Sequence, residues 1–212
     1  TLPVAAGQRK SCFAQTEPDA GSDPGAMRTR AVREGDWWRI NGVKRFITDA
    51  KQADFCQLMA VTEPERGTRG ISCFMVDMHL DGVKISAEFD TLMGDRPCEI
   101  VFDNVRVPAA NLVGREGDGF RLGQEWITRG RIFRHGARSV GVAERCLELG
   151  AAYAKQRVTF GSPLATRQSV QFMLADTYAE MQQIRLLVWR AAQKLDDGED
   201  ARMDSWLAKT YG

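Results

Sequence analysis

The sequence has few of the residues that build metal centres and disulfide scaffolds. Only two histidines are present, His79 and His135, and they lie far apart in the chain. The five cysteines are odd in number and include no C-x-x-C pair; they are Cys12, Cys56, Cys73, Cys98 and Cys146. Such spacing excludes a disulfide framework and a zinc site, and it favours buried apolar packing of the thiols. The sequence therefore predicts no metal site, and any chemistry would use an organic cofactor or none.

An excess of one charge and a long apolar run are also missing. The sequence contains 29 lysines and arginines and 28 aspartates and glutamates, which gives a net charge of +1. Because neither charge is in excess, we expect no nucleic-acid partner. No apolar run approaches the roughly 20 residues that span a bilayer, so no membrane insertion is expected. Residues 1–10 lack the basic start and apolar centre of a signal peptide. These features predict a cytoplasmic protein, or one of the mitochondrial matrix in a eukaryote.

The first half of the sequence reads as short strands separated by turn residues. The predicted strands span 12–15, 26–33, 37–44, 55–62, 71–76, 83–89 and 99–102. Glu34-Gly35-Asp36 is predicted to close a hairpin, and Asn41-Gly42 to form a second turn that leads into Lys44–Thr48. Asp81-Gly82 is expected to form a third turn. This spacing favours an antiparallel β-sandwich or barrel.

The second half has helical periodicity. One helix is predicted to begin after Asp118 as its N-cap, a second to span about 166–195, and a third to begin near Arg202. Glycines 123, 130, 136, 141 and 150 are expected to permit close approach of helices. The predicted fold class is therefore α+β: a β-domain over residues 1–115, followed over 116–212 by an incomplete up-down helical bundle.

Three segments carry groups suited to binding a flat, phosphorylated ligand. The Thr16–Asp23 segment offers hydroxyls, backbone amides and a glycine, although a plain surface turn has the same composition. Phe46-Ile47-Thr48 places an aromatic ring and a hydroxyl on one side of a strand, which ordinary strand packing would also explain. The third segment, Arg157–Gly161, places a guanidinium and a hydroxyl near the start of the helix that Gln168 opens, which suits a diphosphate. The alternative interpretation of this segment is a simple loop that joins two helices.

Taken together and in order, these segments resemble the acyl-CoA dehydrogenase family of flavoproteins. The matching strings are Thr16–Asp23, Ile40–Thr48, Met93-Gly94, Val101–Pro108, Gly117–Phe120, Arg157–Gly161, and Gln168 with Phe172–Ala175. The resemblance covers essentially the whole chain. It implies the middle β-domain of the family and the first part of its C-terminal helical bundle.

The resemblance implies FAD as the cofactor. The residues that would line or cover the flavin are Phe13, Gln15, Thr16, Gly21, Ser22, Phe46, Ile47 and Thr48. Those that would reach the adenine and diphosphate of an FAD held by a neighbouring subunit are Arg157, Thr159, Phe160 and Gln168. A shared site of this kind implies a homodimer or homotetramer.

The implied reaction is α,β-dehydrogenation of an acyl-CoA thioester, with electrons passed to an electron-transfer flavoprotein. Ser22 and Arg131 are the implied substrate contacts. Arg131 stands ten residues before Gly141, one more than expected, and a local bulge or register change there would argue against its role. The general-base glutamate is expected beyond Gly212. Three kinds of same-fold enzyme remain alternatives, namely an acyl-CoA oxidase, a nitroalkane oxidase and a flavin monooxygenase, as does a non-catalytic interaction fragment.

Overall fold

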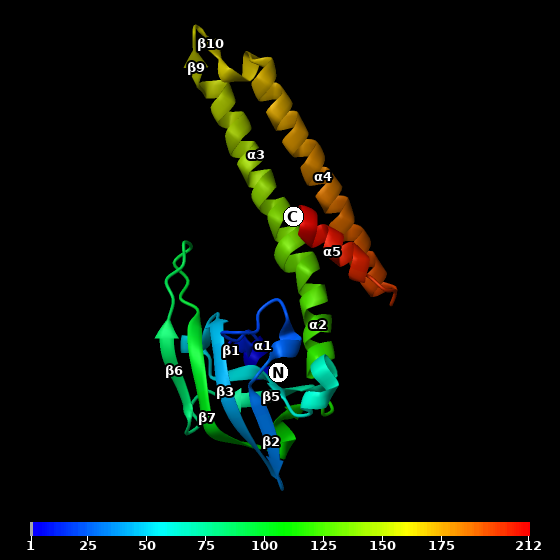
Figure 1. Cartoon of the computed structure of the whole chain (residues 1–212). Coiled ribbons are helices and arrows are strands. Elements are labelled where there is room, and N and C mark those ends of the chain that lie inside the picture. Colours follow the sequence, from blue (N-terminus) through cyan, green and yellow to red (C-terminus); the bar gives the residue numbers. More distant parts are fainter. Residues whose placement is uncertain (1) are drawn as a thin grey trace. The chain divides into compact units, whose positions relative to one another are not determined.

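The computed structural model describes residues 2–212 and consists of two compact units (Figure 1). The first unit ends at Gly123 and the second spans Gln124–Gly212. The division falls within helix α2 (Gly119–Gly130), which starts directly after Asp118 as predicted. Each unit has its own hydrophobic core.

The first unit is built on an eight-stranded sheet with the order β6-β7-β3-β2-β4-β5-β8, and β1 pairs with β4. Its elements are α1 (Leu2–Ala5), β1 (Ser11–Ala14), β2 (Arg30–Glu34), β3 (Trp37–Ile47), β4 (Phe55–Val61), β5 (Ile71–Asp77), β6 (Val83–Glu88), β7 (Cys98–Pro108) and β8 (Leu112–Val113). The α+β class is confirmed, but the sheet is not a closed barrel. The pairing is also not purely antiparallel, because β1 and β2 each pair in parallel with β4.

Strand β3 corrects one prediction, because the chain does not turn at Asn41-Gly42. The strand continues through both residues, and the partner strand β7 absorbs the irregularity: Asp103 and Asn104 both lie opposite Asn41. Asn104 has a φ of 51° there, a left-handed conformation that asparagine tolerates better than most residues. The predicted turns at Gly35 and Gly82 are confirmed, and both glycines have positive φ.

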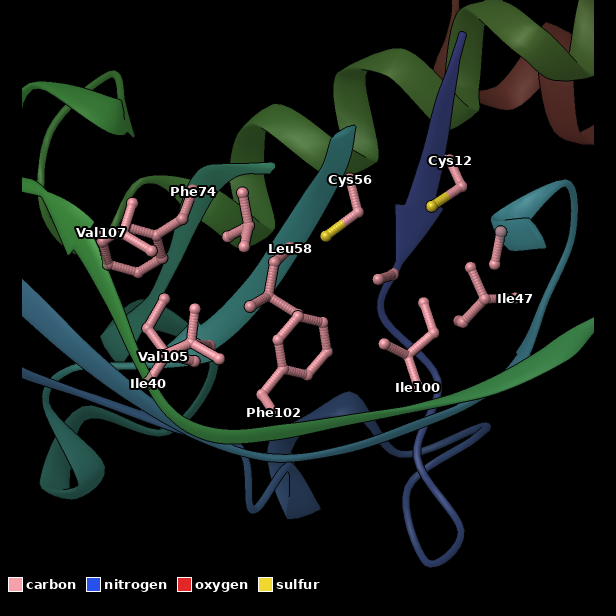
Figure 2. Close-up of a cluster of buried hydrophobic side chains, with 14 of the residues drawn as sticks. Cys12, Ile40, Ile47, Cys56, Leu58, Phe74, Ile100, Phe102, Val105 and Val107 are labelled. Atoms are coloured by element: carbon pink, nitrogen blue, oxygen red, sulfur yellow. The ribbon is translucent and has the colours of Figure 1, made fainter. Parts of the chain in front are cut away.

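The main core lies on one face of this sheet. Alternate residues of β3 and β7 point into it, as expected for a strand with one buried face. Figure 2 labels ten of its side chains: Cys12, Ile40, Ile47, Cys56, Leu58, Phe74, Ile100, Phe102, Val105 and Val107. Four of the five cysteines are buried, which confirms the packing role expected for those four, whereas Cys146 is exposed.

Burial of Cys73 makes the stability of the first unit sensitive to alkaline pH. Burial raises the pKa of the Cys73 thiol to about 11 from the ordinary value of 9.0. Above pH 9 the unfolded chain therefore loses a proton that the folded chain keeps, so stability falls as pH rises. Relative to Cys73→Ala, wild-type protein should lose about 1.4 kcal/mol of unfolding free energy for each pH unit between these two values. Urea unfolding at pH 8, 9 and 10 measures this, and parallel pH curves for the two proteins would contradict it.

The second unit is helical. It contains the end of α2, a π-helical segment η5 (Arg131–Ala137), α3 (Arg138–Gln156), the short strands β9 (Val158–Thr159) and β10 (Ser162–Pro163), α4 (Gln168–Asp196) and α5 (Arg202–Tyr211). In Figure 1, α3 and α4 lie side by side, joined by the β9–β10 hairpin, and α5 packs against α4 and η5. The three predicted helices are confirmed. None of the helices described here is long and apolar enough to cross a membrane.

Only some of the helix glycines mark close packing. A Cβ on Gly136 would lie 2.6 Å from Cγ2 of Val188 and 3.3 Å from Cβ of Ala208, so the η5 backbone lies close against α4 and α5 there. A Cβ on Gly141 would meet nothing within 4 Å. The prediction of close helix approach is therefore confirmed at Gly136 and wrong at Gly141.

Candidate functional site

The loop that follows β1 is held from within by a buried carboxylate. Oε2 of Glu17 accepts a hydrogen bond from the backbone amide of Arg28 at 2.6 Å, and Oε1 accepts one from the backbone amide of Thr29 at 2.9 Å. Glu17 also forms an isolated backbone bridge with Ala20. These bonds leave Gly21 and Ser22 exposed at the loop tip, while Thr16 is half-buried.

Lys44 on β3 binds both the Glu17 carboxylate and the backbone of the loop. Its side chain is fully buried, and Nζ donates to Oε1 of Glu17 at 2.8 Å and to the carbonyl of Gln15 at 3.0 Å. Burial lowers the pKa of Lys44 to about 8, against the opposing effect of Glu17. Burial also acts to raise the pKa of Glu17, but the charge of Lys44 and the donated hydrogen bonds outweigh it and hold that pKa below its usual value. Both groups are therefore charged at neutral pH.

A β-bulge next to Lys44 turns the end of β3 outward. Arg45 and Phe46 both lie opposite the single residue Glu99 of β7. Phe46 has a φ of 59°, and the extra residue reverses which side chains face the core. Ile47 is therefore buried in the main core (Figure 2), while Phe46 and Thr48 are exposed.

The ring of Phe46 is supported by a neighbouring aromatic side chain. It packs against Phe89 with 4.8 Å between ring centroids, and the Arg45 guanidinium lies 5.8 Å from the Phe89 ring. Arg45 is held in turn by Glu99 at 2.7 Å. Even so, Phe46 remains 56% exposed, so part of its ring is available to a ligand.

The loop and the strand end form one surface. The amide of Arg45 donates to the carbonyl of Thr16 at 2.8 Å, which brings the loop beside the residues that precede Phe46. Within residues 2–212 the hydroxyls of Thr16, Ser22 and Thr48 form no hydrogen bond to another protein atom. A Cβ on Gly21 would meet nothing within 4 Å, so a ligand has space to approach this backbone. An exposed aromatic ring, free hydroxyls and open backbone suit the polar edge and flat face of a heterocycle.

Phe13 and Gln15 lie near the start of α2, beside Gly123. Phe13 is half-buried and packs against the core cluster that contains Met27 and Met59. The ring of Phe13 lies 3.6 Å and the amide oxygen of Gln15 3.8 Å from where a Cβ on Gly123 would stand. The structure thus joins Thr16 to the strand that carries Phe46 and Ile47 and leads into Thr48, and it places Phe13 and Gln15 together beside Gly123. The buried side chain of Ile47 leaves only its backbone for a ligand.

The second unit presents the other predicted group on the β9–β10 hairpin. Phe160 and Gly161 form its two-residue turn with φ values of 50° and 78°, and Phe160 is 97% exposed. Arg167 fixes the hairpin by donating to the carbonyl and hydroxyl oxygens of Thr159 at 2.8 and 3.1 Å. The Arg157 guanidinium and the Gln168 amide, by contrast, have no hydrogen-bond partner in the described part of the chain.

Arg131 is the first residue of the π-helical segment and is half-buried. The wider turns of this segment absorb the additional residue between Arg131 and Gly141, so the helix contains a local bulge of the kind that argues against the implied role of Arg131. Arg134 follows in the same segment and lies over Trp126, 4.5 Å from its ring centroid.

Sequence reasoning missed Glu17, Lys44 and Arg167. A signal for Lys44 exists, because it shares the alternating core face of β3 with Trp38 and Ile40, and a lysine on such a face needs a buried partner. Nothing local marks Arg167, whose contacts depend on the fold of the hairpin. No group of three or more His, Cys, Asp or Glu side chains in the described residues could hold a metal ion.

The chain belongs to the acyl-CoA dehydrogenase family. Residues 12–105 match the model of the acyl-CoA dehydrogenase middle domain, and residues 117–212 match that of the acyl-CoA dehydrogenase C-terminal domain. These ranges correspond to the sheet-rich and helical parts of the structure.

Individual relatives agree with this assignment. The chain is 37% identical over 211 residues to the caffeyl-CoA reductase–Etf complex subunit CarC of Acetobacterium woodii, covering 99% of this chain and 55% of that protein. Butyryl-CoA dehydrogenase from Megasphaera elsdenii matches with a TM-score of 0.93 at 35% identity, covering 99% of this chain and 55% of that one. A structure of PigA with FAD and proline matches with a TM-score of 0.94 at 32% identity, over 99% and 55% of the two chains. The chain spans about half the length of the curated relatives it matches.

Proposed function

We propose that this protein catalyses the FAD-dependent α,β-dehydrogenation of an acyl-CoA thioester and passes the electrons to an electron-transfer flavoprotein. The observation that carries the proposal is the surface formed by the Thr16–Ser22 loop and Phe46–Thr48, where free hydroxyls stand beside an exposed aromatic ring. The solved relatives include a butyryl-CoA dehydrogenase and a protein with bound FAD, and CarC is a subunit of an Etf complex.

On this surface the chain's own groups would bind and orient the cofactor. Thr16, Ser22 and Thr48 would donate to the polar edge of the flavin, and Phe46 would cover its ring. Phe13, Gln15, Gly21 and the Ile47 backbone would line the same site. Bound FAD would supply the hydride acceptor of the reaction.

The helical unit would complete the cofactor site of a second subunit in a homodimer or homotetramer. Arg157, Thr159, Phe160 and Gln168 would reach the diphosphate and adenine, since the guanidinium of Arg157 and the amide of Gln168 are free to bind an anion. Ser22 is the proposed substrate contact, whereas the bulge in the π-helical segment argues against Arg131.

The general base is proposed to be a glutamate outside residues 1–212. Glu17, the carboxylate nearest the proposed flavin surface along the chain, cannot take this role. Its two oxygens already accept from Arg28, Thr29 and Lys44, and its side chain is only 4% exposed.

An anaerobic titration tests the proposed reaction. Short, medium and long straight-chain acyl-CoAs are added to the purified full-length flavoprotein, which includes the proposed general-base glutamate, and loss of the oxidised flavin absorbance is followed. We expect at least one of them to bleach the flavin, and no bleaching by any of them would overturn the proposal. Rapid oxygen consumption after reduction would instead identify a same-fold oxidase.

Phe160 supplies a prediction in which stability and cofactor binding change in opposite directions. A phenylalanine at a left-handed turn position is strained, whereas asparagine is favoured in such hairpin turns. Phe160→Asn should therefore raise unfolding free energy by about 1 kcal/mol. It should nevertheless weaken FAD binding by up to about tenfold, because the exposed ring is lost.

Phe160→Leu is the matched control, because it removes the ring and keeps the backbone strain. It should weaken FAD binding without the gain in stability. Thermal unfolding and fluorescence titration with FAD measure the two effects, and unchanged FAD affinity in both variants would contradict the role of Phe160.

A further inference from the structure

The first unit contains a buried ion pair that the proposed chemistry does not use. The Lys44 and Glu17 side chains are 0% and 4% exposed, and their charged atoms lie 2.8 Å apart. Every other ion pair in the described residues has at least one side chain that is a quarter or more exposed. The pair is therefore unusual within this chain, and it lies directly behind the surface proposed to bind the flavin.

The contacts of this pair tie together the two segments of that surface. Three consecutive residues at the start of the loop are bonded to two consecutive residues of β3. Lys44 binds the carbonyl of Gln15 and the carboxylate of Glu17, and the amide of Arg45 binds the carbonyl of Thr16. The next residue of β3 is Phe46, at the bulge that turns the strand end outward.

We propose that Glu17 and Lys44 are positioning residues that set the distance and orientation between the Thr16–Ser22 loop and Phe46–Thr48, so that both segments contact one flavin. The inference rests on the proposed function, because it names what the ion pair does for that site. Neither residue touches the ligand itself, since both side chains are buried behind the surface.

A charged pair suits this role better than apolar packing does. Replacing a buried ion pair by apolar groups of similar volume is often neutral for stability, because two charges no longer need to be desolvated. The bonds of Glu17 and Lys44, however, are directional and specify where the Gln15 carbonyl and the Arg28 and Thr29 amides lie. An apolar pair would fill the space without specifying these positions.

The test separates positioning from stability with the double variant Glu17→Gln/Lys44→Met, made in the full chain. The double variant contains no unpaired buried charge, so we expect it to unfold at a higher temperature than Lys44→Met alone. Its FAD affinity should nevertheless be about tenfold weaker than that of wild type, because the loop is less preorganised. The absorbance spectrum of its bound flavin should also differ from that of wild type.

Asp204→Asn is the matched control. It removes another buried carboxylate, which binds Arg190 and Lys194 at 2.7 Å in the helical unit and contacts neither flavin-facing segment. FAD affinities are compared by fluorescence titration at a temperature where all the proteins are folded. A loss in the double variant larger than that in Asp204→Asn supports the inference, and a loss no larger overturns it. If wild-type protein binds no FAD, the proposed function itself fails, which is a different result.

Discussion

Replacing Lys44 with methionine is expected to lower the free energy of unfolding by about 3 to 5 kcal/mol, the range measured when one partner of a buried ion pair is removed. Lys44 is fully buried, and its loss leaves the Glu17 carboxylate without its cation. The Gln15 carbonyl also loses its donor. Urea unfolding at pH 7, followed by circular dichroism, measures the change.

Lys51→Met is the control for this experiment. Lys51 also forms an ion pair, with Glu88 at 2.6 Å, but its side chain is 62% exposed. Removing an exposed pair should cost no more than about 1 kcal/mol, because water already solvates both charges. Equal losses in the two variants would show that burial of the Glu17–Lys44 pair has no energetic consequence.

Replacing Gly119 with alanine is expected to destabilise the protein by about 3 kcal/mol, at the upper end of the usual cost of overpacking. A Cβ at this position would overlap the carbonyl carbon of Ser72 and lie 2.6 Å from the amide nitrogen of Cys73. These are backbone atoms of β5, so a rotamer change cannot relieve the clash. The start of α2 and the strand would have to separate, and the bond from the Gly117 amide to Oγ of Ser72 would be strained.

Gly141→Ala is the matched substitution for comparison. Gly141 lies within α3, and a Cβ there meets nothing within 4 Å. Alanine should therefore raise stability by about 0.5 to 1 kcal/mol, because it restricts the unfolded chain and favours the helix. Thermal unfolding of both variants measures the difference, and similar melting temperatures would refute the close approach of α2 to β5.

Much of the fold could be predicted because its signals are local. Turn residues between short segments identified most of the strands, and three- and four-residue spacing identified α3 and α4. The hairpin at Gly35 was predictable because a glycine occupies its positive-φ position. The Asn41-Gly42 turn failed for the same reason: these residues favour a turn locally, but pairing along β7 keeps β3 extended through them.

The candidate site was likewise predictable only where its features are local in the sequence. The Thr16–Asp23, Phe46–Thr48 and Arg157–Gly161 segments were recognisable from their residue types and order. The outward placement of Phe46 and Thr48 depends on the bulge opposite Glu99, because one extra residue in a strand exchanges its two faces. No rule of local spacing reports this bulge, since it exists only relative to the partner strand.

By itself, the sequence determined the α+β class, the order of strands before helices and the residue types of the candidate site, because these follow from local periodicity and composition. Only the tertiary structure decided that Glu17 pairs with Lys44, that β1 runs parallel to β4 and that Arg167 holds Thr159. Two of these contacts join segments distant in the chain, and the third depends on how the hairpin folds. Their partners are selected by burial and directional hydrogen bonding, which take effect only when the chain packs.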